Sequence, residues 1–542
     1  MIKSKKSIIV LGALTCTSQL IMAQQVVDPS VVNPSSQNRF TPPKESPNFS
    51  IGPKAGKEDR KSSGETFQLK GIKFSGNSVF STPELNEVIK AKIGQPVDFS
   101  GLQDLVDLVS DYYLAAGYPF SRVYIPTQDV ANGVVEFTIM EGYFGGVLAT
   151  VGVDSQAKPN ADAQAFLGSF KRGEVITSPG VERVGLIMND LPGYAAVPII
   201  RPSTELGAGD LEMRLTETPQ LRGKFGIDNH GSAVTGKNRV KGDVERSRNF
   251  IFGDSIKLSG LVTDGKTNFV AAAYGFPIMA HGARLELSAI QSSYELGGIL
   301  KTSDFKGEST IMGAQTSYPL VRSRMSNMTI LGSYQNRRFS NDRGLTEKYV
   351  IDAFPLGLTF DWRDGINGGA VTYGDIFYTV ANITKDNSPD SNRDRNYSKI
   401  NLNIARIQQL TKNIQGSARY AVQYSQNNLD STEFISLAGP TGVRSYPVGE
   451  FSGHVGWVGQ IELAYLVPDT NHSPYVFYDK GSSKNRTTTV TRNISGKGIG
   501  LRLSQGDLTF DLSASWSVTG GTSLAERDSK SPRLWASLGV RF

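Results

Sequence analysis

The sequence predicts a mainly β protein, in which two small α+β modules precede a transmembrane barrel of about sixteen antiparallel strands. Three observations predict this architecture. The C-terminal part is filled with strand-like segments of about ten residues that alternate apolar and polar side chains. Two earlier segments share the element order β-α-α-β-β. The N-terminus has the features of an export signal.

Residues 1–23 are predicted to be a Sec signal peptide. Lys3, Lys5 and Lys6 precede an apolar stretch over 8–14, and Ala23 is a small residue at a plausible cleavage point. The only cysteine, Cys16, lies inside this segment, which excludes disulfides from the mature chain. Loss of the three lysines reduces the formal charge from +6 to +3, too little to indicate a nucleic-acid partner.

Residues 24–65 are predicted to form a flexible, proline-rich linker. Prolines recur among Ser, Asn, Lys and Gly, which disfavours a packed core and keeps any helix short. The rest of the chain has no apolar run near the ~20 residues of a membrane-spanning helix.

The first module is predicted over residues 66–142. A strand over 67–74 comes first, and Thr82 is expected to cap a helix over 84–92 because Pro83 follows it. A second helix starts near Ser100 and stops at Gly117. Strands over 122–125 and 134–140, separated by an Asn-Gly turn, complete the module.

The second module is predicted over residues 143–219, with strands over 147–153, 196–201 and 211–217 and helices over 161–170 and 181–189. The shared element order favours a tandem duplication, and two unrelated α+β modules are the alternative. Small open sheets have free edges that can accept an extended peptide as an added strand. Both modules are therefore candidate peptide-binding sites.

The barrel is predicted over residues 220–542. In four of its strands the apolar and polar faces separate most clearly, and the apolar positions are Leu508, Phe510, Leu512, Ala514, Trp516 and Val518; Trp457, Gly459, Ile461, Leu463, Tyr465 and Val467; Ile499, Leu501 and Leu503; and Leu534, Ala536, Leu538, Val540 and Phe542. A soluble sandwich would also show this pattern. A membrane barrel is favoured because the chain is predicted to be exported and because bacterial barrels have an even number of strands. Closure of a barrel also removes the free edges that an open sheet would have.

Residues 426–456 are predicted to form a long functional loop between the eleventh and twelfth barrel strands. The stretch lacks a clear strand or helix pattern, yet it contains Arg444, Tyr446 and Phe451, a composition that is wrong for disorder. By itself, a surface loop with one solvated arginine is the simpler interpretation.

Enzyme motifs give little support for catalysis. The segment over 231–237 resembles a phosphate-binding loop, but Asn238 stands where Ser or Thr should hold magnesium, and no helix follows. The four histidines lack metal-ligand spacing. We therefore expect no enzyme, metal or cofactor, and a hydrolase with a triad assembled across strands is the remaining catalytic alternative.

Five short motifs carry a resemblance that covers essentially the whole mature chain. They are Gly71-Ile72-Lys73-Phe74-Ser75-Gly76-Asn77, Ala115-Ala116-Gly117-Tyr118, Asp228-Asn229-His230-Gly231-Ser232 with Thr235-Gly236, Gly439-Pro440-Thr441-Gly442-Val443-Arg444-Ser445-Tyr446, and Phe477-Tyr478-Asp479-Lys480-Gly481. With the predicted architecture, they resemble two-partner secretion transporters, the ShlB, FhaC and HecB type of haemolysin secretion/activation protein within the POTRA–barrel superfamily.

The resemblance implies a location, a function and partners. The barrel would lie in the outer membrane of a Gram-negative bacterium, in contact with lipid, with two POTRA domains in the periplasm. The chain would recognise and secrete, and in some members activate, a large exoprotein such as a haemolysin, adhesin or contact-dependent toxin. The N-terminal secretion domain of this cargo would dock on the POTRA domains, and the barrel assembly machinery would insert the chain. A general outer-membrane insertase and a passive porin or receptor are the alternatives.

The resemblance also implies which residues form the site. The loop folds into the lumen, where Arg444 pairs with Asp479, and Val443, Tyr446, Phe477 and Gly481 complete the two motifs. The sequence departs from the family at Ser445, where glycine is usual, so this backbone is expected to avoid a glycine-only conformation. Members with a plug carry an N-terminal helix in the pore, and residues 24–65 show no convincing candidate. The cargo and the oligomeric state stay open.

Overall fold

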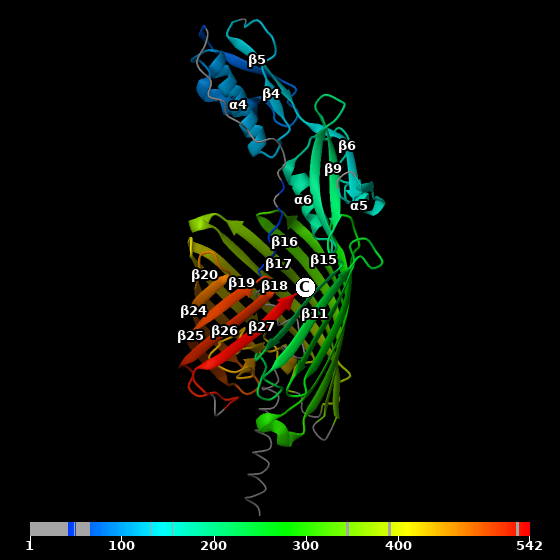
Figure 1. Ribbon diagram of the computed structural model, residues 1–542, viewed down its shortest axis with the longest axis vertical. Helices are drawn as coiled ribbons and strands as arrows, with labels where there is room; N and C mark the ends of the chain where they lie inside the picture. Colours follow the sequence, from blue (N-terminus) through cyan, green and yellow to red (C-terminus); the bar gives the residue numbers. More distant parts are fainter. Residues whose placement is uncertain are drawn as a thin grey trace, which may run out of the picture.

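A computed structural model describes residues 42–47, 49, 65–130, 132–153, 156–342, 346–388, 392–526 and 530–542. The predicted signal peptide and nearly all of the predicted linker, the segment considered for a plug helix, lie outside these residues. Two α+β modules stand in sequence above one end of a barrel (Figure 1). Within the described ranges, no helix is both long and apolar enough to cross a bilayer.

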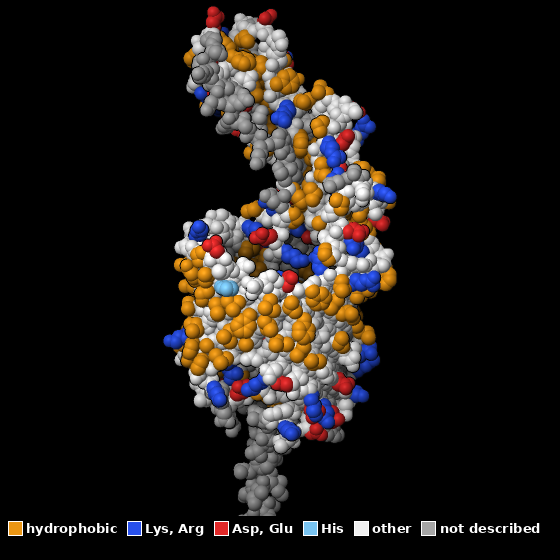
Figure 2. Space-filling view, in the orientation of Figure 1, with side chains coloured by type: hydrophobic (Ala, Val, Ile, Leu, Met, Phe, Trp, Pro, Cys, Tyr) orange, Lys and Arg blue, Asp and Glu red, His pale blue; other side chains and the backbone are white. Residues whose placement is uncertain are grey.

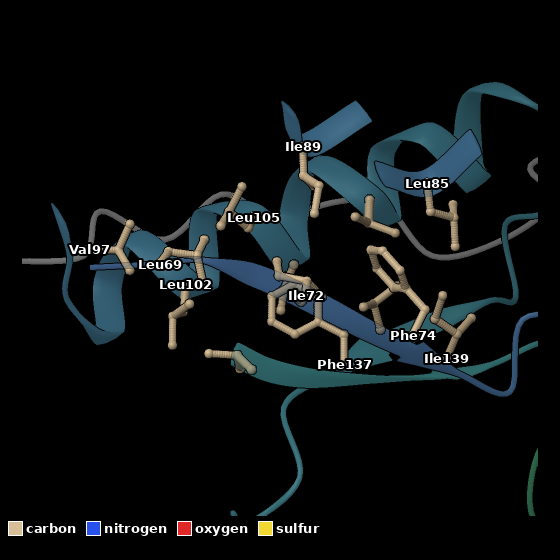
Figure 3. Packing of buried hydrophobic residues seen from close by; sticks show 14 of the residues in the cluster. Leu69, Ile72, Phe74, Leu85, Ile89, Val97, Leu102, Leu105, Phe137 and Ile139 are labelled. Atoms are coloured by element: carbon tan, nitrogen blue, oxygen red, sulfur yellow. The ribbon is translucent and has the colours of Figure 1, made fainter. Parts of the chain in front are cut away.

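The first module places helices on one face of a three-stranded sheet with the order β2-β5-β4. Its elements are β1 (Phe67–Gln68), β2 (Gly71–Ser75), α3 (Thr82–Ile89), η2 (Lys90–Lys92), β3 (Pro96–Val97), α4 (Phe99–Ala115), β4 (Arg122–Tyr124) and β5 (Val134–Met140). Figure 3 shows its core, where Ile72 and Phe74 from β2 meet Leu85, Leu105 and Phe137.

Two predictions in the first module were wrong in detail. The strand expected over 67–74 divides into β1 and β2, because Leu69 bonds to Gly94 and Gln95 on one side while Lys70 N donates to Gly133 O on the other. The first helix is capped by Ser81, one residue before the predicted Thr82. Glu84 Oε2 accepts from Ser81 N at 2.8 Å, which favours the earlier start.

The second module has the sheet order β7-β6-β9-β8. Its elements are β6 (Tyr143–Val151), β7 (Lys158–Pro159), α5 (Ala161–Ala165), α6 (Ser178–Asn189), β8 (Tyr194–Pro202) and β9 (Ala208–Glu217). The helix predicted over 161–170 ends at Ala165, because the chain then continues through tighter turns in which each N–H bonds three residues back, as Gly168 N does to Ala165 O. Apart from the short extra strand β7, the β-α-α-β-β order is present.

Sixteen antiparallel strands close into one barrel, as predicted. They are β10 (Leu221–Asp228), β11 (Arg239–Ser247), β12 (Ser255–Thr263), β13 (Asn268–Pro277), β14 (Arg284–Glu295), β15 (Lys306–Arg322), β16 (Ser326–Asp342), β17 (Thr346–Asp364), β18 (Ala370–Thr384), β19 (Asn396–Thr411), β20 (Ile414–Tyr424), β23 (Val455–Tyr465), β24 (His472–Lys484), β25 (Thr491–Gln505), β26 (Leu508–Thr519) and β27 (Arg533–Arg541). Short helices η4 (Gly298–Ser303) and η5 (Ile366–Gly368) lie in two connections.

Alternation along the strands separates an outer and an inner face. On β23, Ile461 and Leu463 are about half exposed, while the neighbouring Glu462 is 8% exposed. Hydrophobic side chains form a band around the middle of the outer wall, and charged side chains gather beyond its two rims (Figure 2). This distribution is that of a barrel whose outer wall faces lipid, and it overturns the sandwich alternative.

The second module is fixed to the rim of the barrel. Arg322 at the end of β15 forms a bidentate ion pair with Asp190, at 2.7 and 2.8 Å, just after α6. Arg183 on α6 donates to the Pro319 carbonyl at 2.7 Å. Arg322 also donates to Ser46 Oγ at 3.1 Å, within the few described linker residues. The modules therefore stand over the mouth of the lumen.

Candidate functional site

The connection between β20 and β23, residues 425–454, folds back into the barrel; we call it the inward loop. It contains η6 (Ser431–Glu433) and a small ladder of β21 (Ile435–Ser436) and β22 (Ser452–Gly453), short elements that the sequence pattern did not reveal. The loop tip packs against the barrel wall through an apolar cluster. The members of this cluster are Leu437, Ala438, Val443, Tyr446, Phe451, Val458 and Ile494. The loop therefore has a defined position in the lumen.

Arg444 at the loop tip binds Asp479 on β24 through three hydrogen bonds. Its Nε and Nη2 donate to the two carboxylate oxygens at 2.8 and 2.7 Å, and its main-chain N–H donates at 3.1 Å. The guanidinium carbon also lies 3.4 Å from the centre of the Phe477 ring. Asp479 is completely buried. A bidentate contact of this kind fixes the position and the orientation of the loop tip.

The period-two geometry of β24 directs its motif to the lumen, since Phe477, Asp479 and Gly481 share one face. Gly481 allows the loop to approach, because a Cβ there would lie 2.7 Å from Leu437 Cδ1 and 3.4 Å from Val443 Cγ2. The structure thus brings together Val443, Arg444, Phe477, Asp479 and Gly481. The sixth predicted residue, Tyr446, lies with its Oη 2.8 Å from the carbonyls of Thr519 and Gly521.

Sequence reasoning missed an extension of the ion pair along the inner wall. Glu462 on β23 accepts from Arg444 Nη1 at 3.2 Å and from Arg502 on β25 at 2.5 and 3.0 Å. Arg502 also binds Asp511 at 2.9 Å. Glu462 and Arg502 are charged residues on the polar, inward face of strands whose side chains alternate in polarity. This position is a signal from which a role in the lumen could have been predicted. The arrangement is a chain of alternating charges that ends at the loop.

Two residues near the C-terminus hold the main chain of the loop tip. The Arg444 carbonyl accepts from Ser515 Oγ at 2.8 Å and from Trp535 Nε1 at 2.7 Å. Farther along the loop, Glu450 accepts from Arg492 at 2.7 Å and from Ser523 Oγ at 2.6 Å. The tip is therefore bonded to β24, β26 and β27 at once.

Ser445 fits the wall because glycine stands opposite it. A Cβ at Gly496 on β25 would lie 2.0 Å from Ser445 Oγ and 2.5 Å from Ser445 Cβ. Among the described residues, Ser445 is not one of those with positive φ. The backbone at Ser445 thus avoids a glycine-only conformation, as expected. The small residue that this contact needs is Gly496 on the wall.

A second ionic cluster, absent from the sequence interpretation, holds the base of the inward loop. Glu433 pairs with Arg337 on β16 and, at 2.6 Å, with Lys399 on β19. Asp430 pairs with Arg393 at 2.5 Å, and this guanidinium lies 3.7 Å from the Tyr349 ring centre. Base and tip are therefore held by different sides of the wall.

An apolar core surrounds this base cluster. It combines inward-facing strand residues with residues of three loops, and its members are Val234, Tyr294, Leu296, Leu300, Phe305, Phe339, Tyr349, Ile351, Ala353, Ala381, Ile383, Tyr397, Leu429 and Phe434. The loops that contribute Val234, Leu300 and Leu429 follow β10, β14 and β20, at the rim opposite to the modules. This end of the lumen is therefore packed with apolar side chains.

A family profile described as haemolysin secretion/activation protein ShlB/FhaC/HecB matches residues 207–503. The chain belongs to this family. A second profile, POTRA domain of ShlB type, matches residues 67–142. The chain is thus an outer-membrane transporter of the two-partner secretion type, with its POTRA domains in the periplasm.

Known transporters resemble the chain over most of its length. The heme/hemopexin transporter protein HuxB of Haemophilus influenzae (strain 86-028NP) is 22% identical over 453 residues, 80% of this chain and 79% of HuxB. The outer membrane transporter CdiB of Escherichia coli is 23% identical over 433 residues, 74% of this chain and 69% of CdiB.

Solved structures show the same fold. CdiB from Escherichia coli superposes with a TM-score of 0.71 at 18% identity, over 97% of this chain and 98% of that one. BamA from Haemophilus ducreyi lacking POTRA domains 1–3 gives 0.54 at 12% identity, over 88% of this chain and all of that one. The family match therefore supports a secretion transporter over the insertase and porin alternatives.

The structure also shows where two other sequence features lie. In the described ranges, no three His, Cys, Asp or Glu side chains lie together as metal ligands would. The segment that resembled a phosphate loop is the connection between β10 and β11, closed by a bridge between Ser232 and Gly236. Its Val234 is buried in the apolar core, so this segment belongs to the barrel.

Proposed function

We propose that this transporter exports one large exoprotein through its lumen and that the inward loop holds the resting lumen closed. The contact between Arg444 and Asp479 carries the proposal. Removal of one partner from a buried ion pair costs about 3–5 kcal/mol, because the other charge stays buried without compensation. Such a pair suits a closed state that an entering chain displaces.

We infer the direction of export from the arrangement of the two ends of the barrel. The POTRA domains stand at the periplasmic mouth, next to the start of β10 and the ends of β15 and β27. They meet the unfolded cargo first, by binding its N-terminal secretion domain. The cargo then passes the loop tip, and its folding outside the cell drives export.

Recognition by the POTRA domains can be separated from barrel assembly. In a variant that lacks residues 66–219, we expect cargo binding and secretion to be lost while the barrel still inserts. Binding is measured with the N-terminal domain of the partner exoprotein, and insertion by heat-modifiable migration in gels. Retained binding would contradict the proposed role of the POTRA domains.

A further inference from the structure

The inner wall receives Arg444 with side chains from β23, β24, β26 and β27. We call these residues the wall seat, and its members are Glu462, Phe477, Asp479, Ser515 and Trp535. In the resting transporter the wall seat holds one residue of the chain's own loop. An exported chain that displaces the loop would meet the same groups with its own side chains.

The wall seat recognises the shape of a guanidinium as well as its charge. Asp479 accepts from Nε and Nη2 of Arg444, which form one edge of the group, and Glu462 accepts from Nη1 at 3.2 Å. The Phe477 ring lies against the face, 3.4 Å from the guanidinium carbon. A lysine ammonium has neither the fork nor the plane, so it cannot make the edge and face contacts together. The seat therefore selects arginine over lysine.

The main chain of the bound arginine is held as well. The Arg444 N–H donates to Asp479 Oδ2 at 3.1 Å, and its carbonyl accepts from Ser515 Oγ at 2.8 Å and Trp535 Nε1 at 2.7 Å. Every arginine residue in a peptide has the same N–H and carbonyl. None of these bonds therefore requires the arginine to come from the inward loop.

The residues beside the arginine are restricted in size. Ser445, the next residue, lies so close to Gly496 that a Cβ there would be 2.5 Å from Ser445 Cβ. Val443, the preceding residue, is 0% exposed and faces Gly481. A small residue after the arginine and an apolar residue of moderate size before it therefore fit the wall.

Two members of the wall seat are held by contacts that do not involve the loop. Glu462 accepts from Arg502 at 2.5 and 3.0 Å. The Phe477 ring lies over Gly498 of β25, where a Cβ would overlap it. Both residues keep these contacts when the loop leaves, so the seat is largely formed before a second ligand enters. A site formed in advance loses less entropy when the ligand binds.

Asp479 makes simple departure of the loop costly. Among the described residues, Arg444 supplies all the hydrogen bonds that Asp479 accepts, and Asp479 is completely buried. A buried charge left without its partner is strongly unfavourable. Replacement of Arg444 by another arginine avoids this state, because the carboxylate keeps a bidentate partner throughout.

We propose that the wall seat is a binding site for an arginine of the exported chain, which replaces Arg444 as the cargo enters. The preferred segment is extended, with an apolar residue such as valine before the arginine and a small residue after it. This inference rests on the proposed function and names the chemistry by which the cargo releases the loop.

The first test measures binding of the peptide acetyl-Val-Arg-Ser-amide to the full chain in nanodiscs. We expect the Arg444→Ala chain to bind it at least about tenfold more tightly than the unsubstituted chain, because no loop arginine competes for the seat. The peptide acetyl-Val-Lys-Ser-amide should bind at least about tenfold more weakly, since the bidentate contact is lost.

A matched control removes the carboxylate of the seat but keeps its shape. Addition of Asp479→Asn to the Arg444→Ala chain should abolish binding of the arginine peptide. Equal binding of the two peptides, or binding that survives this substitution, would overturn the inference. So would absence of binding by an Arg444→Ala barrel that is folded, as judged by heat-modifiable migration.

The second test follows the loop itself. Val443→Cys places a thiol that is buried while the loop is seated. Excess arginine peptide should increase its labelling by an impermeant maleimide several-fold, whereas the lysine peptide should leave it unchanged. Labelling that rises during export but ignores the arginine peptide would overturn this inference and leave loop release intact. No labelling during export would contradict the proposed function itself.

The third test changes the cargo. Arginines that precede Gly, Ala or Ser in the N-terminal secretion domain of the partner exoprotein are replaced by lysine, which keeps the charge. We expect export to slow several-fold. Replacement of the arginines that precede large residues is the control and should have little effect. Equal export of both altered cargoes would overturn the inference.

Discussion

Secretion by the Arg444→Ala variant is expected to fall to a small fraction of the unsubstituted level. The substitution leaves Asp479 buried without its partner and removes one donor from Glu462. At about 3–5 kcal/mol for a broken buried pair, the balance between seated and released loop shifts by at least about two orders of magnitude. Secretion then falls because the transporter loses the closed state from which, in this proposal, the entering cargo starts export. Cargo release into the medium, at equal barrel levels in the membrane, measures the effect.

Asp479→Ala tests the same contact from the wall. Here Arg444 keeps Glu462, so we expect a loss that is smaller than that of Arg444→Ala. The double variant should be no worse than Arg444→Ala, because both substitutions break one interaction. Strictly additive losses would argue against a direct functional pair. Arg239→Ala is the control, since Arg239 makes a bidentate contact with Asp228 elsewhere in the barrel.

Gly496→Ala is expected to impair secretion because it crowds the loop tip, whereas Arg444→Ala and Asp479→Ala remove a contact from it. The new methyl group would lie 2.0 Å from Ser445 Oγ, so the loop tip must move. Overpacking of this kind typically costs about 1–3 kcal/mol. Ser445→Gly in the same chain removes the overlap, and the double variant should recover most of the secretion.

The rescue makes this prediction specific to the loop. Gly459→Ala on β23 is the matched control, because a Cβ there meets its nearest atom at 3.7 Å, an ordinary contact. Failure of Ser445→Gly to restore secretion would show that Gly496 matters for β25 itself. Recovery would establish that Ser445 and Gly496 fit each other where the loop tip meets the barrel wall.

Local geometry explains what could be predicted from the sequence. Period-two alternation identifies the inward face of each strand, so Phe477, Asp479 and Gly481 could be assigned to one face without a structure. The position of a helix end depends on which of several neighbouring residues caps it. The first helix is therefore capped by Ser81 and not by the predicted Thr82. The expected pair of Arg444 and Asp479 came from the family resemblance, since nothing in the spacing of the two residues requires them to meet.

Barrel closure determines the contacts that could not be predicted. Ser515 and Trp535 bind the Arg444 carbonyl although they are 71 and 91 residues away in the sequence. Arg337 reaches Glu433 from the other side of the wall, across 96 residues. These pairs depend on the register of many consecutive strands, which alternation alone does not specify.

Exposure of Val443 tests the central claim most directly. Val443 is 0% exposed beside the wall, and the mature chain is predicted to contain no cysteine, so Val443→Cys introduces a single buried thiol. Its labelling by a membrane-impermeant maleimide reports whether the loop has left its seat. We predict little labelling in the resting transporter, and strong labelling during cargo export or when Arg444→Ala is added. A thiol that stays unlabelled while secretion proceeds would contradict release of the inward loop.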